Sequence, residues 1–372
     1  MKSILINQPR SSYYVGGAEM VSLQHARFLQ QLGYSVTFVT ISPASIGQPY
    51  SGHYKNFKDQ FGKLLNIIEI SQQAEALTCY DIEPGENRDR WNIESIYYNG
   101  SLVEYLLRSE KRYDTCISYY KLDALVVPRR LIGNNLLYLC GVPKENNEFM
   151  SSFLSAYDTL LAITAEVKGY WQKYASRDIS VVETGVDTDI FYPGAKGAEV
   201  INVLYVGRLI ERKAPDVLVD AISLMPKDIQ NKLRVSIVGS GPMFTLLEEN
   251  LMSAGILHLI SLEGETSNPE KFFSTADICV FPSKRGEGLQ GVILEAMSSG
   301  CYVLASDTQI NRALLQDGRG HVLTASTAHA LSRELSRIIK DEDLLKAGSL
   351  AREYILEKYS WHNVIKKLEK YI

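Results

Sequence analysis

Cysteine is scarce in this 372-residue chain, and its five cysteines form no CxxC pair and no spacing typical of a metal site. They are Cys79, Cys116, Cys140, Cys279 and Cys301. Disulfide frameworks belong to oxidising compartments, so scattered cysteines favour a reduced one. We therefore expect a cytoplasmic protein.

Long hydrophobic runs are also lacking. No stretch approaches the 18 apolar residues that a transmembrane helix needs, so no such helix is expected. The apolar run within Met1–Asn7 is too short for a signal peptide and is interpreted as a first strand. Peripheral membrane contact stays open, because Pro128-Arg129-Arg130 could touch an anionic surface. A solvated loop is the simpler interpretation of that cluster.

An excess of positive charge is absent as well. The chain has 39 basic and 43 acidic residues and a net charge of −4, which argues against a nucleic-acid partner. Hydrophobic residues make up 45% and charged residues 22%, as is ordinary for a globular protein. The length favours two domains, and the oligomeric state is left open.

Short β-rich runs alternate with helical patterns along the chain, which predicts parallel sheets with helices on both faces. Ser3–Asn7 is a predicted strand, and a helix is expected over about Ala18–Leu32, with Gly33 as its C-terminal stop. Residues 42–95 are interpreted as variable loops with one or two buried elements. Further strands are expected at Val36–Ile41, Thr115–Ser118, Leu136–Leu139, Leu160–Ile163 and Ile179–Val182.

The pattern restarts after a boundary near Glu183–Val200, which glycine and proline punctuate. Strands are expected at Ile201–Val206, Val235–Val238, Leu259–Leu262, Ile278–Phe281, Tyr302–Ala305 and His321–Leu323. Helices are expected at Pro215–Leu224, Pro242–Met252, Val292–Ser299, Ala328–Ile339, Leu344–Lys358 and Trp361–Ile372. Ligands of open parallel sheets bind beyond the carboxyl ends of the strands. Two such sheets facing each other would enclose one cleft.

Three motifs carry possible chemistry. Gly16-Gly17-Ala18-Glu19 lies between the first strand and its helix, where glycines admit a ligand and free amides attract an anion. An ordinary turn is the alternative. In the loop after Val206, Arg208 and Lys213 could together neutralise a diphosphate, although solvated surface charge has the same pattern.

The third motif is residues 285–297, in which Glu287 and Glu295 flank a glycine-containing loop and the start of a helix. Gly288 and Gly291 free the backbone to present N–H groups to an anion. A half-buried Glu295 needs partners, and ribose hydroxyls would serve. The alternative is an amphipathic helix with two surface glutamates.

These motifs, in this order, resemble the GT-B retaining glycosyltransferases of family 4 over nearly the whole chain. The resemblance also rests on the motifs Thr184-Gly185-Val186-Asp187, Gly239-Ser240-Gly241-Pro242, Ala276-Asp277 before Pro282-Ser283, and the closing Tyr359-Ser360-Trp361. The resemblance implies two Rossmann-like parallel-sheet domains facing across a deep cleft, with a C-terminal helix that crosses back to the first. It places an acceptor domain at residues 1–190, with part of the helix 359–372, and a donor domain at residues 191–358.

The resemblance also implies the role of each matching position. Arg208, Lys213 and Glu287 would form the catalytic set, the two cations on the donor diphosphate and Glu287 on the hydroxyls of the donor sugar. Glu295 would hold the ribose hydroxyls. The other donor-binding positions are Gly16, Gly17, Gly264, Glu265, Gly288, Leu289, Gln290, Gly291 and Val292.

The implied reaction moves a sugar, most simply from a UDP-sugar, to a glycan, a lipid-linked glycan or a small molecule, as in surface polysaccharide or glycoconjugate biosynthesis. No cofactor and no metal ion are expected, because Arg208 and Lys213 can neutralise the diphosphate. Asp187-Thr188-Asp189 resembles a DxD metal motif, but Asp187 is interpreted as structural. The Gly239-Ser240-Gly241 pattern is weak evidence for a dinucleotide site.

Two departures from the family pattern qualify these roles. Many relatives have a histidine in the region that corresponds to Asp114–Asp123, where this chain has none, and Tyr119 or Tyr120 is expected to fill the space. The second glycine after Glu287 is shifted by one position, to Gly291. A nucleotide-sugar epimerase of the same fold and a non-catalytic nucleotide-sugar-binding protein are the alternative functions.

Overall fold

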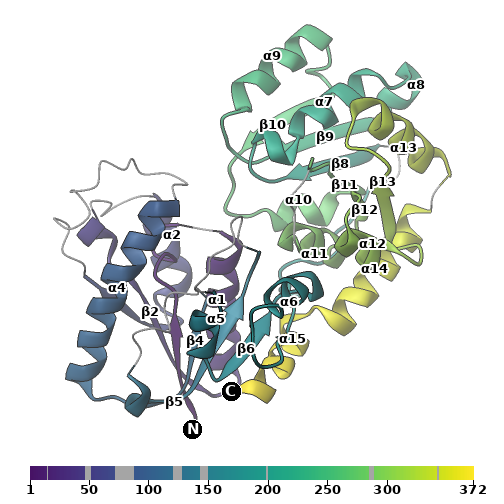
Figure 1. The fold of residues 1–372 in the computed structure, drawn as a ribbon. Helices are drawn as coiled ribbons and strands as arrows, with labels where there is room; N and C mark the ends of the chain where they lie inside the picture. Colours follow the sequence, from purple (N-terminus) through teal and green to yellow (C-terminus); the bar gives the residue numbers. More distant parts are fainter. Residues whose placement is uncertain are drawn as a thin grey trace. The chain divides into compact units, whose positions relative to one another are not determined.

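The computed structural model describes residues 1–14, 16–46, 52–71, 88–119, 128–142, 150–197, 200–284, 289–341 and 343–372. They form two compact units, each drawn as a sheet with helices in Figure 1. The first unit contains Met1–Thr184 and Val364–Ile372, and the second contains Gly185–Asn363. The assignment of acceptor and donor domains to residues 1–190 and 191–358 stays a prediction.

The first unit is built on a seven-stranded parallel sheet with the order β3-β2-β1-β4-β5-β6-β7. Its strands are β1 (Ser3–Asn7), β2 (Ser35–Ile41), β3 (Asn66–Ile70), β4 (Tyr113–Ser118), β5 (Ile132–Leu139), β6 (Thr159–Ala162) and β7 (Ser180–Val181). Ile4 of β1 lies beside Val36 on one side and Thr115 on the other. The strand order reverses between β1 and β4, and such a switch point is where open sheets bind ligands.

The helices of the first unit follow its strands in alternation. They are α1 (Gly17–Gln31), α2 (Gly52–Phe61), α4 (Arg88–Ser109), α5 (Met150–Ser155) and α6 (Ala165–Trp171). Helix α1 ends as expected, because Gly33 adopts a left-handed φ of 91° just beyond it. The region predicted as variable loops, 42–95, contains α2, β3 and the start of α4, while 72–87 lie outside the described residues.

The second unit repeats the design with a six-stranded parallel sheet in the order β10-β9-β8-β11-β12-β13. Its strands are β8 (Ile201–Val206), β9 (Leu233–Val238), β10 (Ile260–Gly264), β11 (Ile278–Phe281), β12 (Tyr302–Ser306) and β13 (Gly320–Leu323). Alternate side chains enter opposite core layers, so Val203 and Tyr205 lie in one and Leu204 in the other. Both faces of this sheet are therefore buried.

Two sets of helices cover those faces. One layer contains α7 (Pro215–Ser223), α9 (Phe244–Ala254) and α13 (Ala328–Asp341). The other is built mainly from α10 (Glu270–Thr275), α11 (Gly291–Ser298), α12 (Gln309–Leu315) and α14 (Leu344–Lys358). None of the helices within the described ranges has the length and hydrophobicity needed to span a bilayer.

The chain returns to the first unit at its end. Helix α15 (Trp361–Leu368) leads into residues 369–371, and the Lys2 Nζ donates to the Ile372 carbonyl oxygen over 2.7 Å. The Asn134 Nδ2 likewise donates to the Tyr371 carbonyl oxygen over 2.7 Å. The predicted fold class is confirmed in its two Rossmann-like parallel sheets and in its returning C-terminal helix.

Candidate functional site

The loops after β8, β9 and β10 form one hydrogen-bonded edge of the second unit. The Gly239 amide donates to the Gly264 carbonyl oxygen over 2.7 Å, and the Leu209 amide donates to the Ser240 carbonyl oxygen over 2.8 Å. The Met243 amide returns to the Leu209 carbonyl oxygen over 3.0 Å. Because these are backbone contacts, each loop fixes the path of its neighbour.

Two glycines make this close approach possible. Gly239 has a φ of 143°, and a Cβ there would lie 1.9 Å from the Gly207 carbonyl oxygen. Gly241 has a φ of 154°, and its Cβ would lie 2.4 Å from the Leu209 carbonyl oxygen. Residues with a side chain rarely adopt this region and would collide here. The Gly239-Ser240-Gly241 pattern thus serves loop packing, which accounts for it without a dinucleotide.

Lys213 lies at the end of the loop after β8, just before helix α7. Ala214 follows it in the left-handed region at φ 52°, and Pro215 begins the helix. The Lys213 Nζ donates to the Gln290 Oε1 over 2.8 Å. Arg208 lies on the same loop with an exposed side chain. The structure therefore gathers both predicted cations on one loop and connects it to the residue before α11.

Gln290 is the N-cap residue of α11, with an extended backbone at φ −92° and ψ 118°. Its side chain is 7% exposed, and its Nε2 is buried without a hydrogen-bond partner among the described residues. The first amides of a helix have no acceptor within it, which leaves those of Gly291 and Val292 available. The sequence predicted that the Leu289–Val292 backbone faces a ligand but did not predict the side-chain contact with Lys213.

Glu295 lies one turn along α11 from these amides. Its side chain is half-buried, and burial raises the pKa of its carboxyl group to about 7. No described residue donates a hydrogen bond to this carboxylate. Burying an unpartnered carboxylate is costly, so the site is suited to a ligand that donates hydroxyl hydrogen bonds.

Gly264 and Glu265 close the same edge at the end of β10. Gly264 has a left-handed φ of 72°, and the exposed Glu265 accepts a hydrogen bond from the Ser240 Oγ over 3.1 Å. The Lys284 amide, after β11, donates to the Arg212 carbonyl oxygen over 2.9 Å. The loops after β8 to β11 therefore follow one another along the edge where the strand order reverses between β8 and β11.

Four predicted positions are not described at this edge. Gly16 and Gly17 begin α1 in the first unit, and no described atom would lie within 4 Å of a Cβ on Gly17. Glu287 and Gly288 fall outside the described residues. The roles predicted for all these residues stay predictions.

Glu19, the last residue of the Gly16–Glu19 motif, forms a buried ion pair within the first unit. Its Oε1 lies 3.1 Å from the Arg10 Nη2, and the two side chains are 4% and 7% exposed. Tyr119 is also a core residue, because its hydroxyl lies 2.6 Å from the buried Nδ1 of His25. Burial lowers the pKa of His25 to about 3, so this imidazole stays neutral at physiological pH. Tyr120 falls outside the described residues.

Two further sequence features have structural partners. The Asp187 Oδ1 accepts a hydrogen bond from the Asp189 amide over 3.2 Å, which fits the structural role predicted for it. Arg129 donates to Asp158 over 2.6 Å and to the Ala156 carbonyl oxygen over 2.7 Å. The guanidinium group is thus bonded within the first unit.

Comparison with known proteins gives consistent results. Residues 201–341 match the family model described as glycosyl transferases group 1. A phosphatidyl-myo-inositol mannosyltransferase of Mycobacterium leprae is 30% identical over 173 residues, which cover 45% of this chain and 45% of that protein. The chain spans about half the length of the curated relatives it matches.

Solved structures resemble the whole chain. The sucrose-phosphate synthase of Thermosynechococcus elongatus superposes with a TM-score of 0.77 at 18% identity, covering 100% of this chain and 98% of that one. The Anabaena protein HepE in complex with UDP superposes with a TM-score of 0.72 at 15% identity, covering 100% and 99%. At these identities the likeness shows the GT-B fold alone.

Proposed function

We propose that this chain, whose residues 201–341 match the family model of glycosyl transferases group 1, transfers a sugar from a nucleotide-sugar donor to an acceptor. The observation that carries the proposal is the shared edge of the second unit. There Lys213 is bonded to the residue before α11, and α11 presents free amides and the unpartnered Glu295. Cations, amides and a carboxylate in this order match a diphosphate followed by a ribose.

The chemistry of the leaving group explains why these groups are needed. When the glycosidic bond breaks, negative charge grows on the departing nucleoside diphosphate. Lys213, Arg208 and the first amides of α11 would stabilise that charge from fixed positions, and preorganised donors of this kind give large rate effects. Glu295 would accept hydrogen bonds from the ribose hydroxyls. No metal ion or cofactor enters the proposal, because the two cations supply the positive charge.

UDP is the nucleotide that we propose, because the neighbouring HepE structure contains UDP. Retention of the anomeric configuration follows from the family resemblance of the motifs. Glycans, lipid-linked glycans and small molecules are the candidate acceptors. An epimerase of the same fold and a nucleotide-sugar-binding protein without turnover are the alternatives.

A thermal-shift panel with UDP, GDP and ADP and their sugars tests the donor site, because a ligand raises apparent stability by mass action. We expect stabilisation by one nucleotide series, and its loss in Lys213→Ala and Glu295→Ala. Nucleotide release with an acceptor panel then tests transfer. Binding without release across a broad panel would favour the non-catalytic alternative, and no binding of any nucleotide sugar would refute the proposal.

A further inference from the structure

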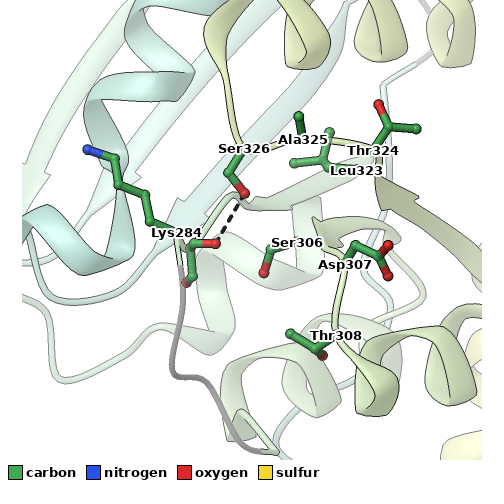
Figure 2. Close-up of a pocket in the computed structure, with 9 residues that line it drawn as sticks. Lys284, Ser306, Asp307, Thr308, Leu323, Thr324, Ala325 and Ser326 are labelled. Atoms are coloured by element: carbon green, nitrogen blue, oxygen red, sulfur yellow. Dashed lines mark hydrogen bonds between the residues drawn. The ribbon is translucent and has the colours of Figure 1, made fainter.

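A small cavity of about 190 Å³ lies at the carboxyl ends of β11, β12 and β13 in the second unit. Figure 2 shows three loops converging on it, one after each strand. Its lining residues are Ser283, Lys284, Ser306, Asp307, Thr308, Leu323, Thr324, Ala325 and Ser326. None of these positions is among those predicted for the donor. At roughly 30 Å³ per water in the liquid, the space exceeds what one or two waters fill.

One hydroxyl of this cavity has no partner among the residues that the structure describes. Ser306, the last residue of β12, is 5% exposed, and its Oγ is buried without a hydrogen-bond partner among the described residues. A buried polar group is normally hydrogen-bonded, and leaving it unpartnered costs stability. A ligand that enters the cavity can supply the missing partner.

The rest of the lining is rich in hydroxyls whose hydrogen-bonding capacity is only partly used. The Ser326 Oγ donates to the Ser283 carbonyl oxygen over 3.1 Å, which leaves its lone pairs able to accept (Figure 2). The Thr308 Oγ1 accepts from the Asn311 amide over 3.1 Å, which leaves its own proton able to donate. Hydroxyls that both donate and accept are complementary to other hydroxyls.

The two charged residues of the lining are directed elsewhere. The Lys284 side chain extends away from the other lining residues in Figure 2, and its Nζ lies 3.8 Å from Asp216. Asp307 is paired with the guanidinium group of Arg312, whose Nη2 lies 2.6 Å from its Oδ2. No unneutralised charge of either sign is therefore directed at the cavity by its lining, which disfavours phosphate or another ion as occupant.

We propose that this cavity binds one neutral pyranose ring. The hydroxyls of Ser306, Thr308 and Ser326 would bond its hydroxyl groups, and the exposed Ala325 offers an apolar surface to its C–H groups. Ligand pockets commonly orient a ligand through a few precisely placed polar groups on a mainly apolar lining. The ring belongs either to the sugar of the donor or to a sugar residue of the acceptor.

The cavity adjoins the edge described above, since the amide of its lining residue Lys284 donates to the carbonyl oxygen of Arg212, next to Lys213. Which substrate supplies the ring, the donor or the acceptor, therefore rests on the proposed transferase function. The inference that the cavity binds a neutral hydroxylated ring does not rest on it. The experiment has to separate these two parts.

Ser306→Ala is the first variant, because it deletes an unpartnered hydroxyl and should fold as stably as the wild type. Titration calorimetry would follow UDP, UDP-sugars and a panel of methyl pyranosides, the last with UDP present. We expect unchanged affinity for UDP and about threefold to tenfold weaker binding of one ring-bearing probe, as for one lost hydrogen bond. Weaker UDP-sugar binding alone assigns the ring to the donor, and weaker methyl pyranoside binding alone assigns it to the acceptor.

Ala325→Leu is the second variant and fills the cavity from an exposed rim position. It should weaken the same probe at least as strongly while preserving the thermal unfolding midpoint. If neither variant changes the affinity for any ring-bearing probe, the pyranose site is refuted. If the wild type fails to bind UDP but still binds a methyl pyranoside in a Ser306-dependent way, the donor proposal fails and the cavity proposal stands.

Discussion

Both units place a loop with glycine and charged residues after their first strand, but they hold it in different ways. In the first unit, the loop after β1 is fixed through side chains, since Arg10 and Glu19 pair while almost completely buried. In the second, the loop after β8 is fixed through the backbone, by contacts that Gly239 and Gly241 permit. As a result, Arg208 keeps an exposed side chain and Lys213 a half-buried one.

The difference teaches how one sequence pattern can serve two purposes. Where side chains hold the loop, its charges neutralise each other inside the fold. Where the backbone holds the loop, the charged side chains are not needed to fix its path, and Arg208 stays exposed. A glycine turn with nearby charges therefore identifies a ligand site only once the partners of those charges are known.

The largest loss of stability is expected when the buried Arg10–Glu19 pair of the first unit is broken. Glu19→Ala should lower the free energy of unfolding by about 3–5 kcal/mol, because it leaves Arg10 charged and buried. Urea denaturation followed by circular dichroism measures the loss. The double variant Arg10→Met/Glu19→Leu should recover most of it, since an apolar pair of similar size has no charge to bury. A loss below about 1 kcal/mol in Glu19→Ala would contradict a structural role.

In the second unit, by contrast, removing a charged side chain is expected to lower the rate of catalysis. Lys213→Ala should lower kcat by about 10²–10³, equivalent to about 2.7–4 kcal/mol of transition-state stabilisation, because one fixed donor to the leaving diphosphate is lost. Steady-state nucleotide release measures it. Lys271→Ala, an exposed lysine on α10 of the same unit, is the matched control and should be unaffected. Equal activity of the two variants would place the diphosphate elsewhere.

The pH dependence of the free energy of unfolding tests the burial of Glu295 in the second unit. Its folded-state pKa of about 7 lies above the ordinary value for glutamate, so the native state binds this proton more tightly than the unfolded state. Its contribution to stability is therefore full at low pH and is lost as the pH rises toward 7. Glu295→Gln does not titrate, so it should gain about 2 kcal/mol relative to the wild type between pH 5 and pH 8.

Denaturation curves of both proteins at the two pH values would measure this change. The same variant should bind the nucleotide more weakly at pH 8, where the wild-type carboxylate is charged and accepts ribose hydroxyls. If the difference in unfolding free energy between the wild type and Glu295→Gln does not change with pH, burial does not raise the pKa of Glu295.

The smallest effect on stability is expected at Gly17. Because no described atom lies within 4 Å of a Cβ there, Gly17→Ala should change the free energy of unfolding by at most about 1 kcal/mol. It should nevertheless reduce turnover severalfold if the diphosphate approaches this helix start. Gly239→Ala is the contrasting variant, since its Cβ would collide with the Gly207 carbonyl oxygen and destabilise the fold. Full activity of Gly17→Ala would remove this residue from the donor site.

The regular parts of the fold were accessible from sequence. β1, β8, β11 and α14 have their predicted bounds, because apolar runs between glycine and polar residues fix such elements locally. The region 42–95 was predicted less well. Helix α4 and strand β3 have mixed polarity there, and their order depends on packing against the sheet.

The candidate site was predictable to a similar extent. Glycines and charges that follow strands indicated Lys213, Gln290 and Glu295, since parallel strands end at one edge. The partners of those side chains were not predictable, as the bond from Lys213 to Gln290 joins residues 77 positions apart. The cavity around Ser306 was missed because serines at strand ends carry no distinctive spacing. Ser283, two residues after β11, and Ser306, at the end of β12, were the available signal.

The return of the chain to its first unit has a consequence for synthesis. Residues 364–372 leave the ribosome after all of the second unit, yet they pack with residues such as Lys2 and Asn134. The second unit can thus be completed while the first unit, whose sheet is already made, still lacks its last segment. Nascent chains stalled before this segment should therefore show protease resistance first in the later-made half, which reverses the usual order of domain maturation.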